Sequence, residues 1–252
     1  MNMVQTAIIT GYGINADYEL AQAFILAGAK ADRIHIQELI EHPAILEGYH
    51  ILAFPGGFSF GDHIGSGLVF AHLVKKYLKN QLDLFIKRGG LVIGVCNGFQ
   101  VLVKMGILPN LSGGWQPETS LIHNDSGVFE DNWVTVSFNA LSPCVWTKNL
   151  PEMDLPIRHG EGKFITASED VRNKLRQKEL IALVYKDHNP NGSELNIAGI
   201  TDSSGRILGL MPHPEAFLYP QNHPRWSREA VAEGAGVKIF RNGVLFVEEK
   251  RC

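Results

Sequence analysis

The sequence is poor in cysteine and has no long apolar run. Only 3 of its 252 residues are cysteines, Cys96, Cys144 and Cys252. Their odd number and wide spacing fit neither a disulfide framework nor a zinc site, and we predict that the chain binds no metal. No window reaches the roughly 18 uninterrupted apolar residues of a membrane span, and the N-terminus lacks the pattern of a signal peptide. We therefore expect a cytoplasmic protein that does not contact a membrane.

The sequence also has no large excess of positive or negative charge. The formal net charge is −3, and the sequence has no run of about five or six like charges. This balance argues against a polyanion-binding surface, so we expect no nucleic acid partner. With 252 residues, of which 45% are hydrophobic, the chain can bury a substantial core. No Pro-, Ser- or Gly-rich linker divides it, and residues 1–252 are predicted to form a single domain.

The first half of the chain alternates apolar strand patterns with helical ones. Strands that read as continuous apolar runs separated by helices indicate an α/β fold with a mostly parallel sheet and helices on both faces. Ligands bind such sheets at the carboxyl ends of the strands, where several glycines of this sequence fall. The pattern predicts strands over 4–10, 33–36, 50–54 and 91–95, and helices over 17–26 and 97–105.

Beyond residue 110 the pattern changes to short strands separated by turn clusters. We expect this half to add β structure to the same sheet or to fold over it. The predicted strands cover 133–138, 180–185, 197–200 and 207–211, and a final helix is predicted over 227–240.

One cysteine stands where a strand pattern meets a helix pattern. The segment Gly94–Gly98 reads G-x-C-x-G, the thiol counterpart of the G-x-S-x-G nucleophile elbow. The small glycines allow strand and helix to approach closely, and the unpaired N–H groups at the helix start favour a thiolate at Cys96. We predict that Cys96 is a nucleophile. The alternative is a small buried core residue, the usual place of a free cysteine; Cys144 and Cys252 lack such a context.

A partner for this thiol lies near the end of the chain. Met211-Pro212-His213-Pro214-Glu215 follows an apolar strand pattern, and its two prolines keep the backbone extended. Residues two apart then project to the same side, so Glu215 can orient His213, and the two complete a Cys-His-Glu triad. His213 could instead be an ordinary loop histidine. A metal site at His213 and Glu215 is disfavoured because no third ligand lies nearby in the sequence.

The triad also needs donors for an oxyanion. The loop 54–58 follows a strand and offers glycine amides that no side chain obstructs. The amide of Asn97, directly after the nucleophile, is the predicted second donor. A Gly-Gly pair after a strand is otherwise simply a turn.

Five motifs follow one another along the chain. They are PGGFSFGD (55–62), GVCNGFQ (94–100), RHGEGKF (158–164), NPNGSELNIAGI (189–200) and LGLMPHPE (208–215). With these motifs in this order, the chain resembles the glutamine amidotransferase component of phosphoribosylformylglycinamidine synthase, a class I glutamine amidotransferase of the triad type.

The resemblance implies a flavodoxin-like fold and a definite chemistry. Glutamine would be hydrolysed through a γ-glutamyl thioester on Cys96. The ammonia would pass to a synthetase subunit that converts formylglycinamide ribonucleotide to formylglycinamidine ribonucleotide in purine biosynthesis. No cofactor is implied on this chain; ATP and Mg belong to the synthetase. The site residues that the resemblance implies besides the triad are Gly57 for the oxyanion and Gln100, Asn124, Ser126 and Phe129 for glutamine. The segment 158–163 resembles a motif near the synthetase interface.

Two departures from the family pattern keep alternatives open. An arginine common in the family is missing from the stretch 63–67, and Ala216 follows Glu215 where an arginine is common. A triad glutaminase that serves a different ATP-dependent amidation partner is therefore one alternative. A catalytically silent regulatory subunit of the same fold is the other, although the intact triad argues against it.

Overall fold

A nine-stranded mixed sheet runs through the part of the chain that the structure describes, residues 3–228 and 233–251 of a computed structural model. Its strand order is β2-β1-β3-β4-β11-β10-β9-β6-β7, in which the neighbours from β2 to β11 are parallel and those from β11 to β7 antiparallel. The strands are β1 (Gln5–Thr10), β2 (Lys30–His35), β3 (Ile51–Phe54), β4 (Leu91–Val95), β6 (Glu130–Phe138), β7 (Met153–His159), β9 (Ile181–Tyr185), β10 (Ile197–Thr201) and β11 (Ile207–Leu210).

A separate two-stranded antiparallel ribbon pairs β5 (Thr119–Ile122) with β8 (Lys163–Thr166). The second half of the chain was expected to add strands to the sheet or to fold over it. Most of its strands extend the sheet, and β5 and β8 form the separate ribbon. The mostly parallel core of the sheet confirms the predicted fold class.

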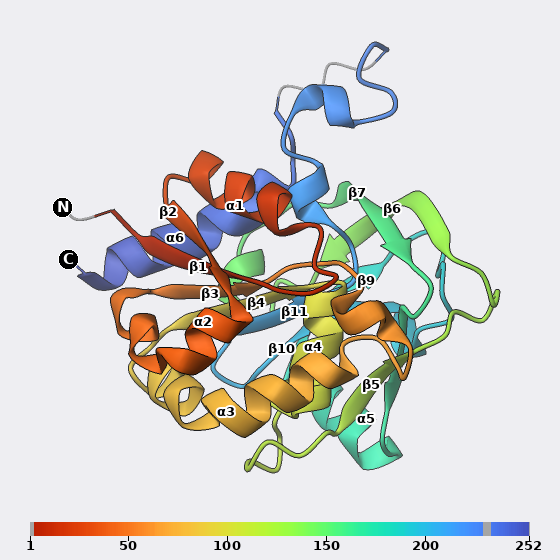
Figure 1. The fold of residues 1–252 in the computed structure, drawn as a ribbon. Helices are drawn as coiled ribbons and strands as arrows, with labels where there is room; N and C mark the ends of the chain where they lie inside the picture. Colours follow the sequence, from red (N-terminus) through yellow and green to blue (C-terminus); the bar gives the residue numbers. More distant parts are fainter. Residues whose placement is uncertain (1–2, 229–232, 252) are drawn as a thin grey trace.

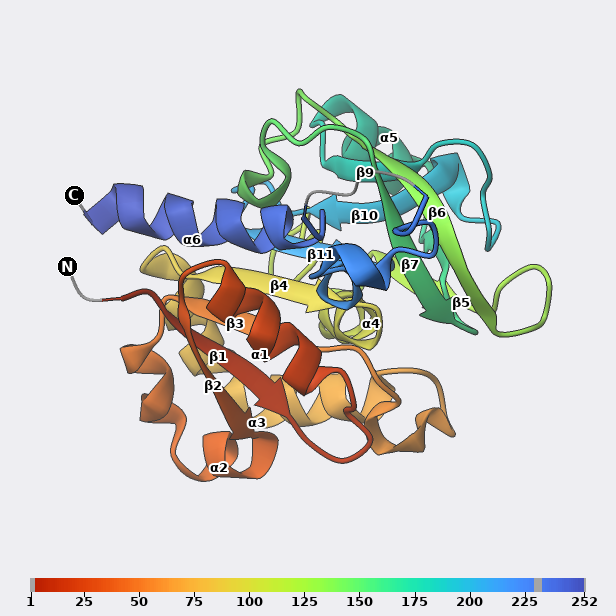
Figure 2. The same cartoon turned by 90° about the horizontal axis from the view of Figure 1, so that it is seen from above.

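Helices cover both faces of the sheet (Figures 1 and 2). On one face α1 (Asp17–Leu26) packs beside α6 (Val237–Arg251), and on the other α3 (Leu68–Lys87) packs beside α4 (Asn97–Met105). The shorter α2 (Ile36–Glu41) follows β2, and α5 (Glu169–Gln177) follows β8. None of the described helices is long and apolar enough to cross a membrane.

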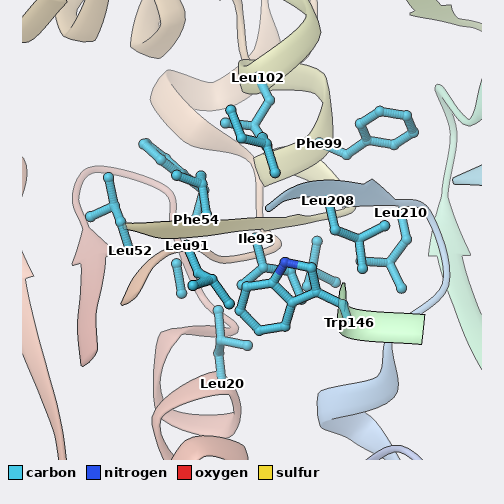
Figure 3. Packing of buried hydrophobic residues seen from close by; sticks show 14 of the residues in the cluster. Leu20, Leu52, Phe54, Leu91, Ile93, Phe99, Leu102, Trp146, Leu208 and Leu210 are labelled. Atoms are coloured by element: carbon cyan, nitrogen blue, oxygen red, sulfur yellow. The ribbon is translucent and has the colours of Figure 1, made fainter. Parts of the chain in front are cut away.

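Buried apolar side chains pack against both sides of β4, which lies inside the sheet between β3 and β11. Leu20 of α1 and Trp146 pack against one side of this strand, and Leu102 of α4 packs against the other (Figure 3). All three side chains are fully buried. Burying an apolar side chain of this size contributes about 1.5–3 kcal/mol, so the packing fixes the position at which β4 ends and α4 begins.

The predicted helix over 227–240 is confirmed over 237–240 and is wrong over 227–228 and 233–236. The structure begins α6 at Val237, and residues 229–232 lie outside the described part of the chain. Two glycines explain the late start. A Cβ on Gly234 would lie 2.1 Å from the carbonyl carbon of Leu218, and one on Gly236 would lie 1.9 Å from the carbonyl oxygen of Pro214. This segment is therefore a loop pressed against the backbone near 214–218.

Candidate active site

Cys96 occupies a sharp elbow between β4 and α4. Its backbone has φ 50° and ψ −106°, a conformation that a residue with a side chain adopts only when the surroundings enforce it. The two flanking glycines make the elbow possible. A Cβ on Gly94 would lie 2.7 Å from the carbonyl carbon of Gly98, and a Cβ on Gly98 would lie 2.0 Å from the carbonyl oxygen of Phe54. The elbow thus places the thiol at the first turn of α4, where backbone N–H groups lack partners within the helix.

His213 follows β11, the neighbour of β4, and is anchored by the edge strand β7. Its backbone N–H donates to the carbonyl of Pro156 at 2.8 Å. Its Nδ1 atom lies 2.6 Å from Oε1 of Glu215, and both side chains are buried. His213 Nε2 is buried with no hydrogen-bond partner among the described residues, which leaves this nitrogen available for a substrate or for the thiol.

The charges around His213 favour its protonated form. Burial by itself lowers the pKa of the imidazole, but the negative charges of Glu215 and of Cys96 outweigh it and raise the pKa of His213 to about 10. A thiolate at Cys96 and an imidazolium at His213 therefore stabilise each other. This is the state in which a cysteine attacks a carbonyl carbon.

The loop after β3 brings two glycines to this pair. Gly57 has φ +146°, and a Cβ there would lie 2.7 Å from the carbonyl oxygen of Gly13. A Cβ on Gly56 would lie 2.8 Å from Cε1 of His213. Side chains at either position would push the loop away from the histidine. The loop is also fastened to α4, since the Asn97 side chain accepts from the Ser59 amide at 3.4 Å.

Gly57, Cys96 and His213 all line one cavity of about 190 Å³. A larger cavity, of about 430 Å³, lies between α3 and the β5–β8 ribbon, but the triad does not line it. We place the candidate active site in the smaller cavity because it contains the thiol and the imidazole. Its lining residues are Asn15, Ala16, Glu19, Gly57, Phe58, Cys96, Phe129, Arg158 and His213.

One of the predicted glutamine-binding residues lies in this cavity. Phe129 is half exposed and faces Phe58 with their ring centroids 6.3 Å apart, so the two rings form an aromatic wall. Ser126 is exposed and donates to Glu130 at 2.7 Å, outside the cavity lining.

The other two predicted glutamine-binding residues are buried away from the cavity lining. Gln100 donates to the carbonyl of Glu161 at 2.7 Å and accepts from Asn97 at 3.0 Å. Asn124 donates to the carbonyl of His159 at 2.8 Å and accepts from the Gly162 amide at 2.9 Å. Both side chains hold the loop 160–162 in place. Their direct contact with glutamine stays a prediction.

Arg158 and Glu19 also line this cavity, although neither was predicted as a residue of the site. Arg158 was assigned to an interface motif, yet its side chain lines the cavity together with Glu19, and Nη2 of Arg158 lies 3.1 Å from Oε2 of Glu19. The alternation of side chains along β7 is the signal that could have found it, because that alternation puts Arg158 and His159 on opposite faces. The strand was not predicted because Pro156 interrupts its sequence pattern. Proline is tolerated here because β7 lies on the edge of the sheet.

The described residues contain no group of three or more His, Cys, Asp or Glu side chains arranged to hold a metal ion.

Comparison with known proteins gives a consistent result over nearly the whole chain. Residues 3–247 match the CobB/CobQ-like glutamine amidotransferase domain family. The chain is 43% identical over 258 residues to phosphoribosylformylglycinamidine synthase subunit PurQ of Dehalococcoides mccartyi, with 99% of this chain and 100% of that protein covered. It is 39% identical to the PurQ subunit of Methanococcus maripaludis strain C7, with 95% and 96% covered. Among solved structures, a chain of PurLQS from Thermotoga maritima has a TM-score of 0.74 and 26% identity, with 98% of this chain and 100% of that chain covered.

Proposed function

The chain belongs to the CobB/CobQ-like glutamine amidotransferase family, and from the site in its cavity we propose that it is the glutaminase subunit of a phosphoribosylformylglycinamidine synthase. In this role it hydrolyses glutamine and supplies ammonia for purine biosynthesis. The observation that carries the proposal is the convergence of Cys96, His213 and Gly57 on one small cavity, with Glu215 behind the histidine.

The first half of the reaction is the formation of a thioester. The thiolate of Cys96 attacks the side-chain carbonyl carbon of glutamine, and the carbonyl oxygen becomes an oxyanion. The amides of Gly57 and Asn97 stabilise this charge. As the tetrahedral intermediate collapses, the carbon–nitrogen bond breaks, and the imidazolium of His213 gives its proton to the leaving nitrogen. The products are ammonia and a γ-glutamyl thioester on Cys96.

The second half reverses the role of the histidine. The neutral imidazole of His213 takes a proton from water, which attacks the thioester carbonyl. The carbon–sulfur bond breaks, glutamate leaves, and the thiolate and imidazolium are restored. Glu215 holds the ring in one orientation throughout and stabilises its charged form.

A synthetase subunit is the proposed partner. The relatives in the comparison are subunits by name, and the Thermotoga maritima structure is of PurLQS, an assembly. We infer that ATP and Mg are used by the synthetase, which joins the ammonia to formylglycinamide ribonucleotide. Completion of such sites by partner binding or closure is common, so the isolated chain is expected to be weakly active.

Glutamate release tests this function. We would compare the wild type with Cys96→Ala and with Cys144→Ala, each alone and with a PurL-type synthetase, its ribonucleotide substrate and ATP. The proposal predicts release that rises with the synthetase, is lost in Cys96→Ala and is retained in Cys144→Ala. Glutamate release that depends on Cys96 but is unchanged by the synthetase would contradict the purine assignment. No glutamate release under any condition would favour a silent subunit.

A further inference from the structure

We propose that Lys104, Asp62 and Glu161 form a charged clamp that positions the two oxyanion donors of the site. The clamp joins three parts of the chain, because Lys104 lies on α4, Asp62 in the segment after β3 and Glu161 in the loop between β7 and β8. The inference rests on the proposed function. It adds three positioning residues that lie outside the lining of the active-site cavity.

The segment 59–67, which follows the oxyanion loop, has an unfavourable backbone conformation. Phe60 and Asp62 have φ 56° and 54°, in the left-handed region that residues with a side chain rarely adopt. Such a conformation persists only where surrounding contacts enforce it. A Cβ on Gly67 would lie 3.0 Å from the amide nitrogen of Val101, so the segment lies directly against α4 (Figure 1). Contacts with α4 therefore determine where the segment lies.

The polar side chains of α4 lie on one face of the helix. They are Asn97, Gln100 and Lys104, and their spacing of three and four residues places them in one row. The other side chains of α4 are apolar and buried. A polar row on an otherwise apolar helix needs polar partners, and here the segment 59–67 and the loop 160–162 provide them.

Asp62 holds the start of this row. Its Oδ1 atom accepts from Nδ2 of Asn97 at 3.4 Å and from the Gly67 amide at 3.2 Å. The Oδ1 atom of Asn97 in turn accepts from the amide of Ser59, two residues beyond Gly57. Because Gly57 and Asn97 carry the two proposed oxyanion amides, the Asp62 carboxylate influences the position of both.

Lys104 and Glu161 hold the other end of the segment at Ser66. The ammonium group of Lys104 donates to the Ser66 carbonyl, and Oε2 of Glu161 accepts from the Ser66 amide at 3.3 Å. The negative charges of Asp62 and Glu161 both act on this ammonium group, and they also repel each other. Lys104 is therefore the cation that allows the two carboxylates to lie near one another.

The charges of the clamp are partly removed from water. Burial lowers the pKa of the Lys104 ammonium group, although the charges of Glu161 and Asp62 oppose this shift. Burial raises the pKa of Asp62, and the charge of Glu161 adds to this shift. Without the cation, the repulsion between the two carboxylates would be only weakly screened. We expect the carboxylates to move apart, and the segment 59–67 to move with Asp62.

The test compares kcat, KM and the reactivity of Cys96 in the complex of the chain with its synthetase. Glutamate release and alkylation of Cys96 by iodoacetamide would be measured for the wild type, Lys104→Met, Asp62→Asn and the double variant. Asparagine keeps an oxygen that can accept from the Gly67 amide and adopts a positive φ readily. Asp62→Asn therefore removes mainly the charge.

Lys75→Met is the matched control. Lys75 on α3 is half-buried like Lys104 and also donates to a backbone carbonyl, that of Trp115 at 2.6 Å. Both lysines line the larger cavity between α3 and the β5–β8 ribbon. The carbonyl that Lys75 contacts lies outside the segment 59–67, so Lys75→Met should leave kcat, KM and alkylation unchanged.

The clamp predicts a loss in kcat. Lys104→Met should lower kcat roughly 10- to 100-fold and change KM less than about threefold, because oxyanion donors stabilise the tetrahedral intermediate more than bound glutamine. Asp62→Asn alone should lower kcat about 3- to 10-fold. Alkylation of Cys96 requires a thiolate but no oxyanion donor, so its rate should change less than about twofold in either variant.

The double variant distinguishes the clamp from a merely structural lysine. Removing the Asp62 charge relieves the repulsion that Lys104→Met leaves behind, so the double variant should be at least about threefold more active than Lys104→Met. A lysine that acts only through packing gives no such recovery.

Three results would overturn the proposal. They are wild-type kcat in Lys104→Met, a double variant no more active than Lys104→Met, and alkylation that slows as much as kcat. If Lys104→Met does not fold, wild-type kcat in Asp62→Asn would overturn it. Glutamate release by the wild-type complex separates this failure from a failure of the proposed function. Release that is unchanged by the substitutions would leave the glutaminase intact, whereas no release from the wild type would contradict the proposed function and the clamp with it.

Discussion

The Nδ1 atom of His213 lies 2.6 Å from Oε1 of Glu215, and both side chains are buried. A contact this short between a buried carboxylate and an imidazole fixes the ring orientation and favours the charged ring. Because the second ring nitrogen has no partner among the described residues, the contact also determines which nitrogen faces the reaction.

Replacing this carboxylate by an amide tests its electrostatic role. Glu215→Gln preserves the shape but removes a charge that raises the pKa of His213, so the pKa should fall and less of the thiolate–imidazolium pair should exist near neutral pH. We expect kcat/KM for glutamine to drop about 10²- to 10⁴-fold and alkylation of Cys96 by iodoacetamide at pH 6.5 to slow. Glu169→Gln, on the exposed side of α5, is the control and should leave both rates unchanged. Equal alkylation rates in the two variants would contradict the argument.

A substitution at Gly57 is expected to lower both kcat and stability. Gly57→Ala introduces a Cβ at φ +146° and 2.7 Å from the carbonyl oxygen of Gly13, so the loop must move. The expected result is a loss of about 10²-fold or more in kcat, because the proposed oxyanion donor is displaced, together with about 1–3 kcal/mol of lost stability.

A substitution at Gly28 distinguishes the effect of a positive φ from the effect of the steric clash at Gly57. Gly28 has φ +97° and open space around its Cβ position. Gly28→Ala should therefore lower the free energy of unfolding measured in urea while leaving kcat intact. If Gly57→Ala retained wild-type kcat, the position of the oxyanion donor would be wrong.

Much of the site could be predicted from local sequence patterns. The predicted bounds of α1, β4 and α4 agree with the structure, since a continuous apolar run followed by G-x-C-x-G specifies strand, elbow and helix within a few residues. The contact between His213 and Glu215 was also predicted, but the extended backbone that was predicted for this segment is wrong, because Pro214–Ala216 form a 3-10 turn. These features depend on neighbours in the chain.

The rest depends on partners that are distant in sequence. Asn124 is a polar residue in a turn, and nothing local indicates that its side chain bonds the backbone at His159 and Gly162. The placement of Arg158 follows from β7 lying on the edge of the sheet, and a strand with an internal proline has a weak pattern. The final helix was predicted too early because apolar spacing does not reveal the close approach of Gly234 to Leu218.

His159 predicts how stability depends on pH. Burial and the charge of His213 lower its pKa from 6.5 to about 4, so the folded chain holds this ring neutral while the unfolded chain protonates it below pH 6.5. The folded-state pKa is the lower one. Its contribution to stability is therefore fully present above pH 6.5 and is lost as the pH falls toward 4.

Between pH 7.5 and 5 this loss should be on the order of 2 kcal/mol in the free energy of unfolding measured in urea. His159→Asn should show a correspondingly smaller change over the same range, because it keeps a donor toward Asn124, which the ring now contacts at 3.2 Å, and cannot be protonated. The same pH dependence in both proteins would show that His159 does not titrate in this way.

The central claim is that Cys96 carries the glutamyl group during turnover. The most direct measurement is acid quenching of the complex with its synthetase during turnover of ¹⁴C-labelled glutamine, followed by mapping of the labelled peptide. The account predicts label on the peptide that contains Cys96, released by base or hydroxylamine, and absent in Cys96→Ala. Turnover without covalent label at Cys96, or label that persists in Cys96→Ala, would contradict it.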